Sequence, residues 1–425
     1  MKQLVIILCL CLAAICCKAQ SMYFPPVSGN TWDTISPARL GWCQSNIDSL
    51  YSYLAQTNTD AFIILKDGKI VLEKYFGSFT ADSIHYWASA GKSLTATLIG
   101  IAQDNALVDI TQPVSAYLGN GWSAAPTVKE GAIQLRHLLS MTSGLDDTPA
   151  LPCDNESPET ACLRYQADTG TRWAYHTGAY IQLQSVLTAV TGQGPTAYTN
   201  SMLGNKIGMQ GFWFDGVYYS KARSMARFGL LSLNKGVWAA DSILKSTEYF
   251  NSMITTSQPY NNSYGYLWWL NGKSSYMSPG LQFTFNGSLI PNAPADMYAA
   301  LGKNDQKIYV VPSQAMVVIR TGESAYGTAL AFSPFDDRLW GKIDSLGIAC
   351  KYNFTGNGNW SSSANWQNQE LPPPVLSKQA SIYINPVPGG NCILNQQQTI
   401  SSGSNLVIPT GTQLIIQGNL TIKNQ

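Results

Sequence analysis

The chain has 425 residues, of which 45% are hydrophobic and 11% aromatic. This is enough apolar material for at least one large packed domain, and it excludes a largely disordered chain. The 26 Lys and Arg residues are balanced by 25 Asp and Glu residues, which leaves a net charge of +1. Without a long basic run, nucleic acid is not an expected partner.

The N-terminus has the pattern of a secretory signal peptide, with Lys2 before an apolar stretch at residues 4–17 and a small residue at Ala19. We expect residues 1–19 to be this signal, with cleavage after Ala19. A buried core helix is the alternative. No later stretch approaches the roughly 20 apolar residues of a membrane span, so we expect no transmembrane segment in a mature protein that is periplasmic or secreted.

The first part of the mature chain predicts a helix followed by a hairpin. Apolar side chains recur at helical spacing over residues 47–54. Residues 61–72 then form two apolar runs about the dipeptide Asp67-Gly68. Asp-Gly between two such runs is a strong hairpin signal.

The following residues alternate between helical and strand character. Residues 89–209 are mostly helical in period, and strand patterns return at residues 297–301, 307–311 and 316–320. Residues 334–348 predict a closing helix. These patterns predict an α+β fold, in which an antiparallel sheet is flanked by helices and carries an inserted helical domain.

The composition changes after Lys351, and we divide the mature chain into a large α+β domain at residues 20–351 and an all-β module at residues 352–425. Asn, Gly, Ser and Gln dominate this module, and three Gly-led segments with alternating apolar positions predict short stacked β rungs. Trp360 and Trp366 offer two interpretations: contact with carbohydrate or another surface, or a structural role within the module.

Five of the nine cysteines lie outside the predicted signal. Cys153 and Cys162 bracket a short loop and are the first expected disulfide. The second expected pair is Cys43 with Cys350, because an antiparallel packing of the first and closing helices would bring them together. Cys392 would remain unpaired. Free buried thiols are the alternative.

The main chemical signal is Ser89 followed three residues later by Lys92, at the start of an apolar helix. Positions i and i+3 share one face of a helix, so the lysine stem is directed toward the hydroxyl. A serine nucleophile needs a partner that takes its proton, and a lysine serves only if burial or nearby positive charge lowers its pKa. The helix N-terminus also favours a developing oxyanion.

Tyr175 supplies a second proton-handling group, with the hydroxyl of Thr177 two residues on, in a segment just before another helix. A tyrosine beside a lysine can carry a proton from nucleophile to leaving group. A buried tyrosine with a purely structural hydroxyl is the alternative.

Residues 89–92, 133–145 and 175–177 together resemble the successive motifs of the serine β-lactamase and penicillin-binding-protein superfamily. The resemblance covers roughly residues 40–350 and is closest to the class C β-lactamase and esterase branch. It implies a β-lactamase/transpeptidase-like fold and a β-lactamase-related serine hydrolase.

The resemblance also implies site roles: acylation of Ser89, Lys92 as base or proton relay, and Tyr175 as the tyrosine of a Tyr-x-Asn motif. Thr177 departs from this motif because it stands where asparagine is usual. A hydroxyl in place of an amide weakens the expectation of β-lactam recognition.

The third family motif, Lys-Thr-Gly or His-x-Gly, is best matched by Lys303-Asn304-Asp305. We expect Thr177, Lys303 and Asn304 to contact the substrate, with Lys303 binding a carboxylate or biasing the local field. Asp305 stands where a glycine is usual and is expected to bring negative charge near the oxyanion. The backbone N–H groups of Ser89 and Gln306 are the expected oxyanion-hole donors.

The three histidines, His85, His137 and His176, are not spaced with other ligands as a metal site requires, so neither metal nor cofactor is expected. His137 is expected to be structural, and His176 to point away from the side chain of Tyr175. A Ser-His-Asp triad on His85 is the rival mechanism, although a Gly-x-Ser-x-Gly elbow is missing around Ser89.

These observations predict an exported serine hydrolase that cleaves an ester or amide of a small or peptide-like substrate through an acyl-serine intermediate. Two alternatives remain open. One is a penicillin-binding protein or β-lactamase that acts on cell-wall peptides or β-lactams. The other is a catalytically degenerate protein whose C-terminal module binds a surface.

Overall fold

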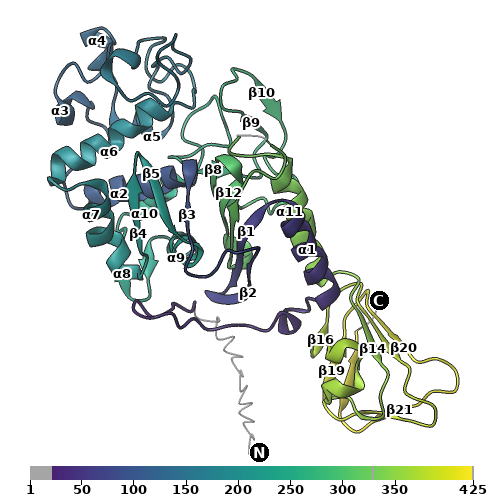
Figure 1. Ribbon diagram of the computed structural model, residues 1–425. Helices are drawn as coiled ribbons and strands as arrows, with labels where there is room; N and C mark the ends of the chain where they lie inside the picture. The colour runs from purple at the N-terminus through teal and green to yellow at the C-terminus, as the bar shows by residue number, and fades with distance from the viewer. Residues whose placement is uncertain (1–21, 328–329, 424–425) are drawn as a thin grey trace, which may run out of the picture.

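An antiparallel sheet forms the centre of the larger part of the molecule (Figure 1). The computed structural model describes residues 22–327 and 330–423, so the predicted signal peptide lies outside the described residues. Within them, the sheet has six strands in the order β2-β1-β13-β12-β11-β8. Their bounds are β1 Thr59–Lys66, β2 Lys69–Tyr75, β8 Trp269–Leu270, β11 Tyr298–Gly302, β12 Gln306–Val311 and β13 Met316–Gly322.

The predicted hairpin and the three later strands are confirmed. Asp67 and Gly68 connect β1 to β2 with φ values of 52° and 81°. Positive φ at both turn residues is the geometry that Asp-Gly favours. β1 pairs with β13, so strands from the two ends of the domain meet at the middle of the sheet. Both strands are almost entirely buried, which explains their continuous apolar runs.

Helices cover the two faces of the sheet. α1 Gln44–Gln56 and α11 Pro334–Asp344 lie side by side on one face (Figure 1), and α9 Ala222–Leu233 packs on β1, β12 and β13 from the other. The predicted closing helix is therefore confirmed, although α11 gives way to a 3-10 turn after Asp344. The end of this turn meets the start of α1, where Cys43 forms the expected disulfide with Cys350.

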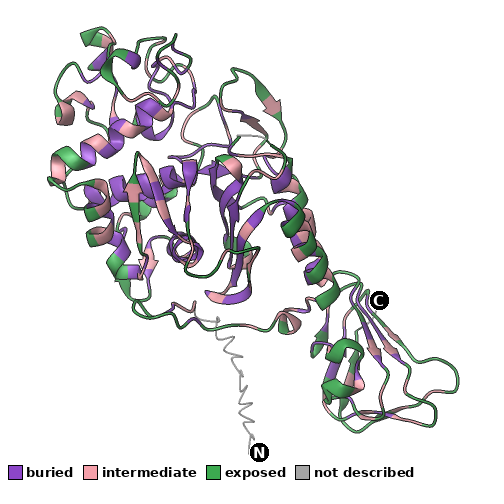
Figure 2. Ribbon diagram, viewed as in Figure 1, coloured by how far each residue is buried: buried purple, intermediate pink, exposed green. Residues whose placement is uncertain are grey.

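The inserted helical region is also confirmed, and α2 lies at its centre. Every residue of α2 from Gly91 to Ala102 is buried (Figure 2), because the helix packs between β11, α6 and α10. The second expected disulfide, Cys153–Cys162, lies in a loop of this region. The helices are α2 Gly91–Asp104, α3 Ser115–Leu118, α4 Thr127–Glu130, α5 Leu135–Leu139, α6 Thr177–Thr191, α7 Pro195–Thr199, α8 Asn205–Ile207 and α10 Thr247–Met253.

Short antiparallel sheets complete this part of the chain, and one of them adjoins Ser89. It has the order β3-β5-β4. No helix of the described residues is both long and apolar enough to cross a membrane. The strands of the small sheets are β3 Ile84–Tyr86, β4 Gly211–Phe214, β5 Val217–Lys221, β6 Val237–Trp238, β7 Asp241–Ser242, β9 Ser275–Met277 and β10 Thr284–Asn286.

The C-terminal region is strand-rich, as expected, and builds three parallel sheets in the orders β14-β17-β20, β15-β18-β21 and β16-β19-β22. Consecutive strands therefore belong to different sheets, and three of them complete one turn of a coil. The Gly-led segments do not stack on one another directly, since Leu414 of one segment pairs with Cys392 of the preceding turn. The strands are β14 Lys351–Phe354, β15 Gly358–Asn359, β16 Val375–Leu376, β17 Ser381–Ile384, β18 Cys392–Leu394, β19 Gln397–Ile400, β20 Asn405–Val407, β21 Leu414–Ile416 and β22 Asn419–Ile422.

The two tryptophans of this region are structural. Trp360 and Trp366 are 0% and 3% exposed, their rings meet edge to face at 4.8 Å, and the Trp366 indole N–H donates to the Trp360 carbonyl. A sugar would need exposed ring faces, so these rings do not provide the suggested carbohydrate contact. They form a core of their own with Cys392, which is unpaired as expected.

Candidate active site

Ser89 lies on a 3-10 turn, Ala88–Ala90, that leads directly into α2. The backbone N–H of Trp87 donates to the Tyr218 carbonyl of β5 at 2.8 Å, which fixes the start of the turn. Ala88 has a φ of 47°, in the left-handed region that a residue with a Cβ rarely adopts. Such local strain is common at functional sites, and here it precedes a partly exposed hydroxyl.

Lys92 meets Ser89 as the spacing predicts, with Nζ 3.0 Å from Oγ. Its side chain is only 4% exposed. Burial is the main cause that lowers the pKa of Lys92 to about 7, while the charge of Glu156 raises it and that of Lys303 lowers it. At neutral pH a substantial fraction of the amine is therefore uncharged and able to accept the serine proton.

Tyr175 lies next to Ser89 and Lys92. Its ring centroid is 5.1 Å from the Lys92 Nζ, and its hydroxyl is near enough to Ser89 to influence it. Burial raises the pKa of Tyr175 far above its ordinary value, and the nearby Ser89 hydroxyl offsets only part of this. The phenol therefore keeps its proton at neutral pH and can donate it. Its ring packs in parallel on Trp269, with centroids 6.0 Å apart.

A pocket of about 160 Å³ opens beside these groups. The Lys303 Nζ lies 3.5 Å from the Glu156 Oε1 at its wall, and both side chains are substantially exposed. Thr177 and Lys303 thus lie where substrate contact was expected. The lining residues are Ala88, Ser89, Lys92, Glu156, Pro158, Thr177, Tyr180, Ile181, Asp215, Gly216, Val217 and Lys303.

Two other predicted residues are placed differently. Asn304 does not line this pocket, and its Nδ2 donates to the Tyr86 hydroxyl at 2.7 Å. Gln306 begins the interior strand β12, where it pairs with Gly302. Its backbone lies inside the sheet instead of at the edge that faces Ser89, which does not favour Gln306 as the oxyanion-hole donor.

The sheet edge nearest Ser89 is formed by the end of β11. A Cβ at Gly302 would overlap the Trp87 carbonyl and lie 3.1 Å from the Ala90 nitrogen, so only glycine permits this approach. The backbone N–H of Asn271, just after β8, donates to the Met297 carbonyl, so the backbone groups of residue 297 face the β8 side of β11. Every second residue of a strand turns its backbone groups to the same side, and Lys303 is six residues after Met297. The N–H of Lys303 therefore faces the same side of the sheet, beyond the residues of β11 that pair with β8.

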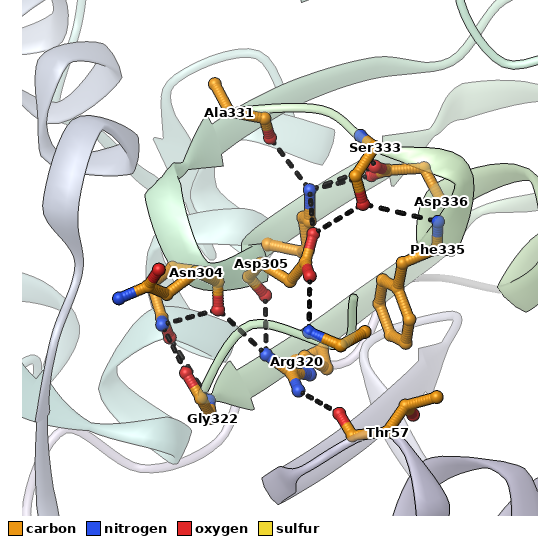
Figure 3. Close-up of polar contacts among 12 residues, drawn as sticks. Thr57, Asn304, Asp305, Arg320, Gly322, Ala331, Ser333, Phe335 and Asp336 are labelled. Carbon is orange, nitrogen blue, oxygen red and sulfur yellow. Dashed lines mark hydrogen bonds and ion pairs between the residues drawn. The ribbon is translucent and has the colours of Figure 1, made fainter. Parts of the chain in front are cut away.

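Asp305 was expected to bring negative charge near the oxyanion, and the structure corrects this. Its carboxylate turns into the protein, is 1% exposed and accepts hydrogen bonds from Ser333 and the Ala325 backbone (Figure 3). Lys307 lies 3.2 Å away. The charge is therefore neutralised on the far side of the turn, away from the pocket.

None of the histidines joins Ser89. The Nε2 of His85 lies 3.3 Å from Asp60, and its Nδ1 lies 3.0 Å from the Tyr86 carbonyl. Both nitrogens are thus engaged elsewhere, which disfavours a triad on His85.

His137 accepts from the backbone N–H of Gln134 at the start of α5, a structural contact as expected. His176 is buried. Among residues 22–327 and 330–423, no group of three or more potential metal ligands occurs.

Sequence reasoning did not assign Tyr180, Glu156 or Asp215 to the site. Tyr180 has its ring 4.7 Å from the Lys92 Nζ, and its hydroxyl contacts Thr95. Its position three residues after Thr177, on the same helix face, was the available signal. Glu156 and Asp215 come from a loop and a hairpin turn, and no local pattern connects either to Ser89.

Known proteins share parts of this sequence and this fold. A curated relative, the 6-aminohexanoate-dimer hydrolase of Paenarthrobacter ureafaciens, is 32% identical over 98 residues, which are 22% of this chain and 25% of the relative. The match thus spans a quarter of that relative's length.

Solved structures match over more of the chain. A Bacillus anthracis protein provisionally named a 6-aminohexanoate-dimer hydrolase has a TM-score of 0.56 and 18% identity, over 76% of this chain and 89% of its own. A family VIII carboxylesterase has a TM-score of 0.54 and 13% identity, and the match covers 74% of this chain and 99% of the carboxylesterase. At these identities the structures establish the fold alone. The Beta-lactamase family model matches residues 47–334, and the chain therefore belongs to the Beta-lactamase family.

Proposed function

We propose that this protein is an exported serine hydrolase that cleaves esters or amides of small or peptide-like substrates through an acyl-Ser89 intermediate. The observation that carries the proposal is the 3.0 Å contact between Ser89 and a buried lysine whose pKa is lowered to about 7. The signal pattern at residues 1–19 and two disulfides support export, because disulfides persist in oxidising compartments.

The chemistry follows from the protonation states. The neutral amine of Lys92 takes the proton of Ser89 as Oγ bonds to the substrate carbonyl carbon. The backbone N–H groups of Ser89 and Lys303 stabilise the oxyanion. Tyr175 gives its proton to the leaving oxygen or nitrogen as the old bond breaks, and Lys92 reprotonates the phenol. Water then releases the acyl group.

The relatives' names favour esters and amides as first substrates. One relative is named a hydrolase of a 6-aminohexanoate dimer and one fold neighbour is named a carboxylesterase. Thr177 lines the pocket where an asparagine is usual in the motif, which places β-lactams second.

Intact-mass measurement tests the proposal. The wild-type protein should gain one fluorophosphonate adduct and hydrolyse p-nitrophenyl butyrate, whereas Ser89→Ala should do neither. Equal labelling of both proteins would contradict catalysis at Ser89 and favour a binding protein. Faster turnover of a chromogenic cephalosporin than of esters and amides would instead assign the site to β-lactams.

A further inference from the structure

The loop closed by Cys153–Cys162 lies against the segment that carries Tyr175. The two cysteines are nine residues apart, and Glu156 and Pro158 of the loop line the active-site pocket. Ser157 approaches the start of α6 so closely that a Cβ at Gly178 would overlap its carbonyl oxygen. The loop and the start of the helix are therefore fitted to each other.

Asn155 makes the main polar connections between the two. Its Nδ2 donates to the Tyr175 carbonyl at 2.8 Å and to the Asp147 carbonyl at 3.0 Å. Its Oδ1 accepts from the backbone N–H of Thr177 at 3.1 Å, and its own carbonyl accepts from Gly178 at 2.8 Å. The Nδ2 and the Oδ1 of the Asn155 side chain are thus both hydrogen-bonded to backbone groups, two of which flank the Tyr175 side chain.

These contacts replace a missing helix cap. The first N–H groups of a helix have no partner within it, and His176, at the N-cap of α6, supplies no side-chain hydrogen bond. Asn155 satisfies the first two N–H groups from a different segment. A change at Asn155 therefore acts on the backbone that follows Tyr175, while its side chain lies outside the pocket lining.

Apart from the exposed Glu156–Lys303 ion pair, the other polar contacts of the loop are mostly local, such as those of the Asp154 carboxylate with Glu156 and Ser157. Ser157 donates to Asp154 at 2.8 Å within the loop, and Gln182 of α6 donates to the Pro158 carbonyl at 2.9 Å. The loop contains no regular secondary structure from 153 to 159. The disulfide is its covalent closure.

We propose that Asn155 is a positioning residue for the Tyr175 hydroxyl, and that the Cys153–Cys162 disulfide maintains it in that role, so that hydrolysis depends on this disulfide. The inference rests on the proposed function. Its specific consequence concerns the leaving group, because Tyr175 is the group that protonates it. Phenolate is a poor leaving group that needs the proton, whereas p-nitrophenolate leaves readily without one.

Steady-state kinetics with phenyl and p-nitrophenyl butyrate test this. Asn155→Ala and the double variant Cys153→Ser/Cys162→Ser should lower kcat/KM, which reports acylation, for the phenyl ester by about thirtyfold, but for the p-nitrophenyl ester by no more than about threefold. Weaker substrate binding would instead lower kcat/KM for both esters alike, and none of these three residues lines the pocket. Tyr175→Phe should show the same selective loss, more strongly.

Matched controls separate this role from general stability. Glu159→Ala alters the same loop at an exposed side chain, and Cys43→Ser/Cys350→Ser removes the other disulfide. Both should keep the wild-type ratio of the two rates. If Asn155→Ala does not fold, Asn155→Asp decides, because it keeps Oδ1 but cannot donate to the Tyr175 carbonyl; it should show the same selective loss.

An unchanged ratio of the two rates in the Asn155 variants would overturn the inference, whether both rates fall together or neither falls. The same ratio change in the controls would also overturn it. Failure of the proposed function looks different: Ser89→Ala would then hydrolyse p-nitrophenyl butyrate as fast as the wild-type protein.

Discussion

The carboxylate of Asp305 lies 3.2 Å from the ammonium of Lys307, and both side chains are buried. Burial acts to raise the pKa of Asp305, but Lys307, the Ala325 N–H, the Ser333 hydroxyl and Arg320 hold it below its ordinary value. Lys307 also contacts Asp336 at 3.0 Å. The turn after β11 is therefore anchored to α11 by buried charges, and the residue that departs from the family motif has a structural role.

Replacing Asp305 with the glycine of the family motif should therefore be harmful to stability. Asp305→Gly removes one carboxylate beside a buried ammonium, which is expected to cost about 3 kcal/mol of unfolding free energy. Urea denaturation would measure this, with the exposed Asp241→Ala as control. A variant as stable as the wild-type protein would show that the Asp336 carboxylate alone is enough to neutralise the buried charge of Lys307.

The rate of acylation should follow the protonation of Lys92. The amine accepts the serine proton only when it is neutral, so kcat/KM should rise with pH through about 7 and level off above it. Below that pH each unit should reduce the rate about tenfold, because a single proton blocks the base. A profile that is flat from pH 5 to 8 would contradict Lys92 as the base.

Lys92 should also lower the stability of the folded protein. Its folded pKa of about 7 lies below the ordinary 10.5, so between these pH values the unfolded chain binds a proton that the folded chain does not, and stability rises with pH. At pH 7, Lys92→Met should abolish turnover yet stabilise the protein, by at most about 5 kcal/mol. The exposed Lys351→Met is the control. Melting curves at pH 7 and 10 would check this, since the gain should shrink at the higher pH.

Local patterns predicted those parts of the site that depend on local geometry. Ser89 and Lys92 share a helix face, so their contact follows from spacing, and the Asp67-Gly68 turn follows from backbone preference. The two disulfides followed from a short loop and from the expected helix packing.

Features that depend on distant partners could not be predicted in this way. The direction of the Asp305 carboxylate is set by Ser333, 28 residues further on, and Glu156 reaches the pocket only through the folded loop. In the C-terminal region, the short repeat of apolar positions is compatible with two arrangements: consecutive segments stacked directly on one another, or a coil with three strands in each turn. Which of the two forms depends on which strands pair. The pairing of Ser381 in β17 with Asn405 in β20, three strands later, shows the coil.

Gly302 should be essential for the contact between β11 and the Ser89 turn. An added methyl group meets the Trp87 carbonyl and the Ala88 Cβ, and neither can yield without moving the backbone. Because this shift separates the N–H of Lys303 from Ser89, Gly302→Ala should slow fluorophosphonate labelling about hundredfold. Gly194→Ala, where an added Cβ meets nothing within 4 Å, should label at the wild-type rate.

The C-terminal region should unfold without loss of the catalytic site. Trp360 is fully buried in a hydrophobic cluster that excludes the residues around Ser89. Trp360→Ala leaves a large cavity in that cluster, at a cost of about 4 kcal/mol, which a small β region has little stability to absorb. Hydrogen exchange should then increase over residues 351–423, while labelling of Ser89 stays at the wild-type rate. Val375→Ala, at a side chain 56% exposed, is the control. Loss of labelling in Trp360→Ala would show instead that the two cores fold as one unit through the Cys43–Cys350 junction.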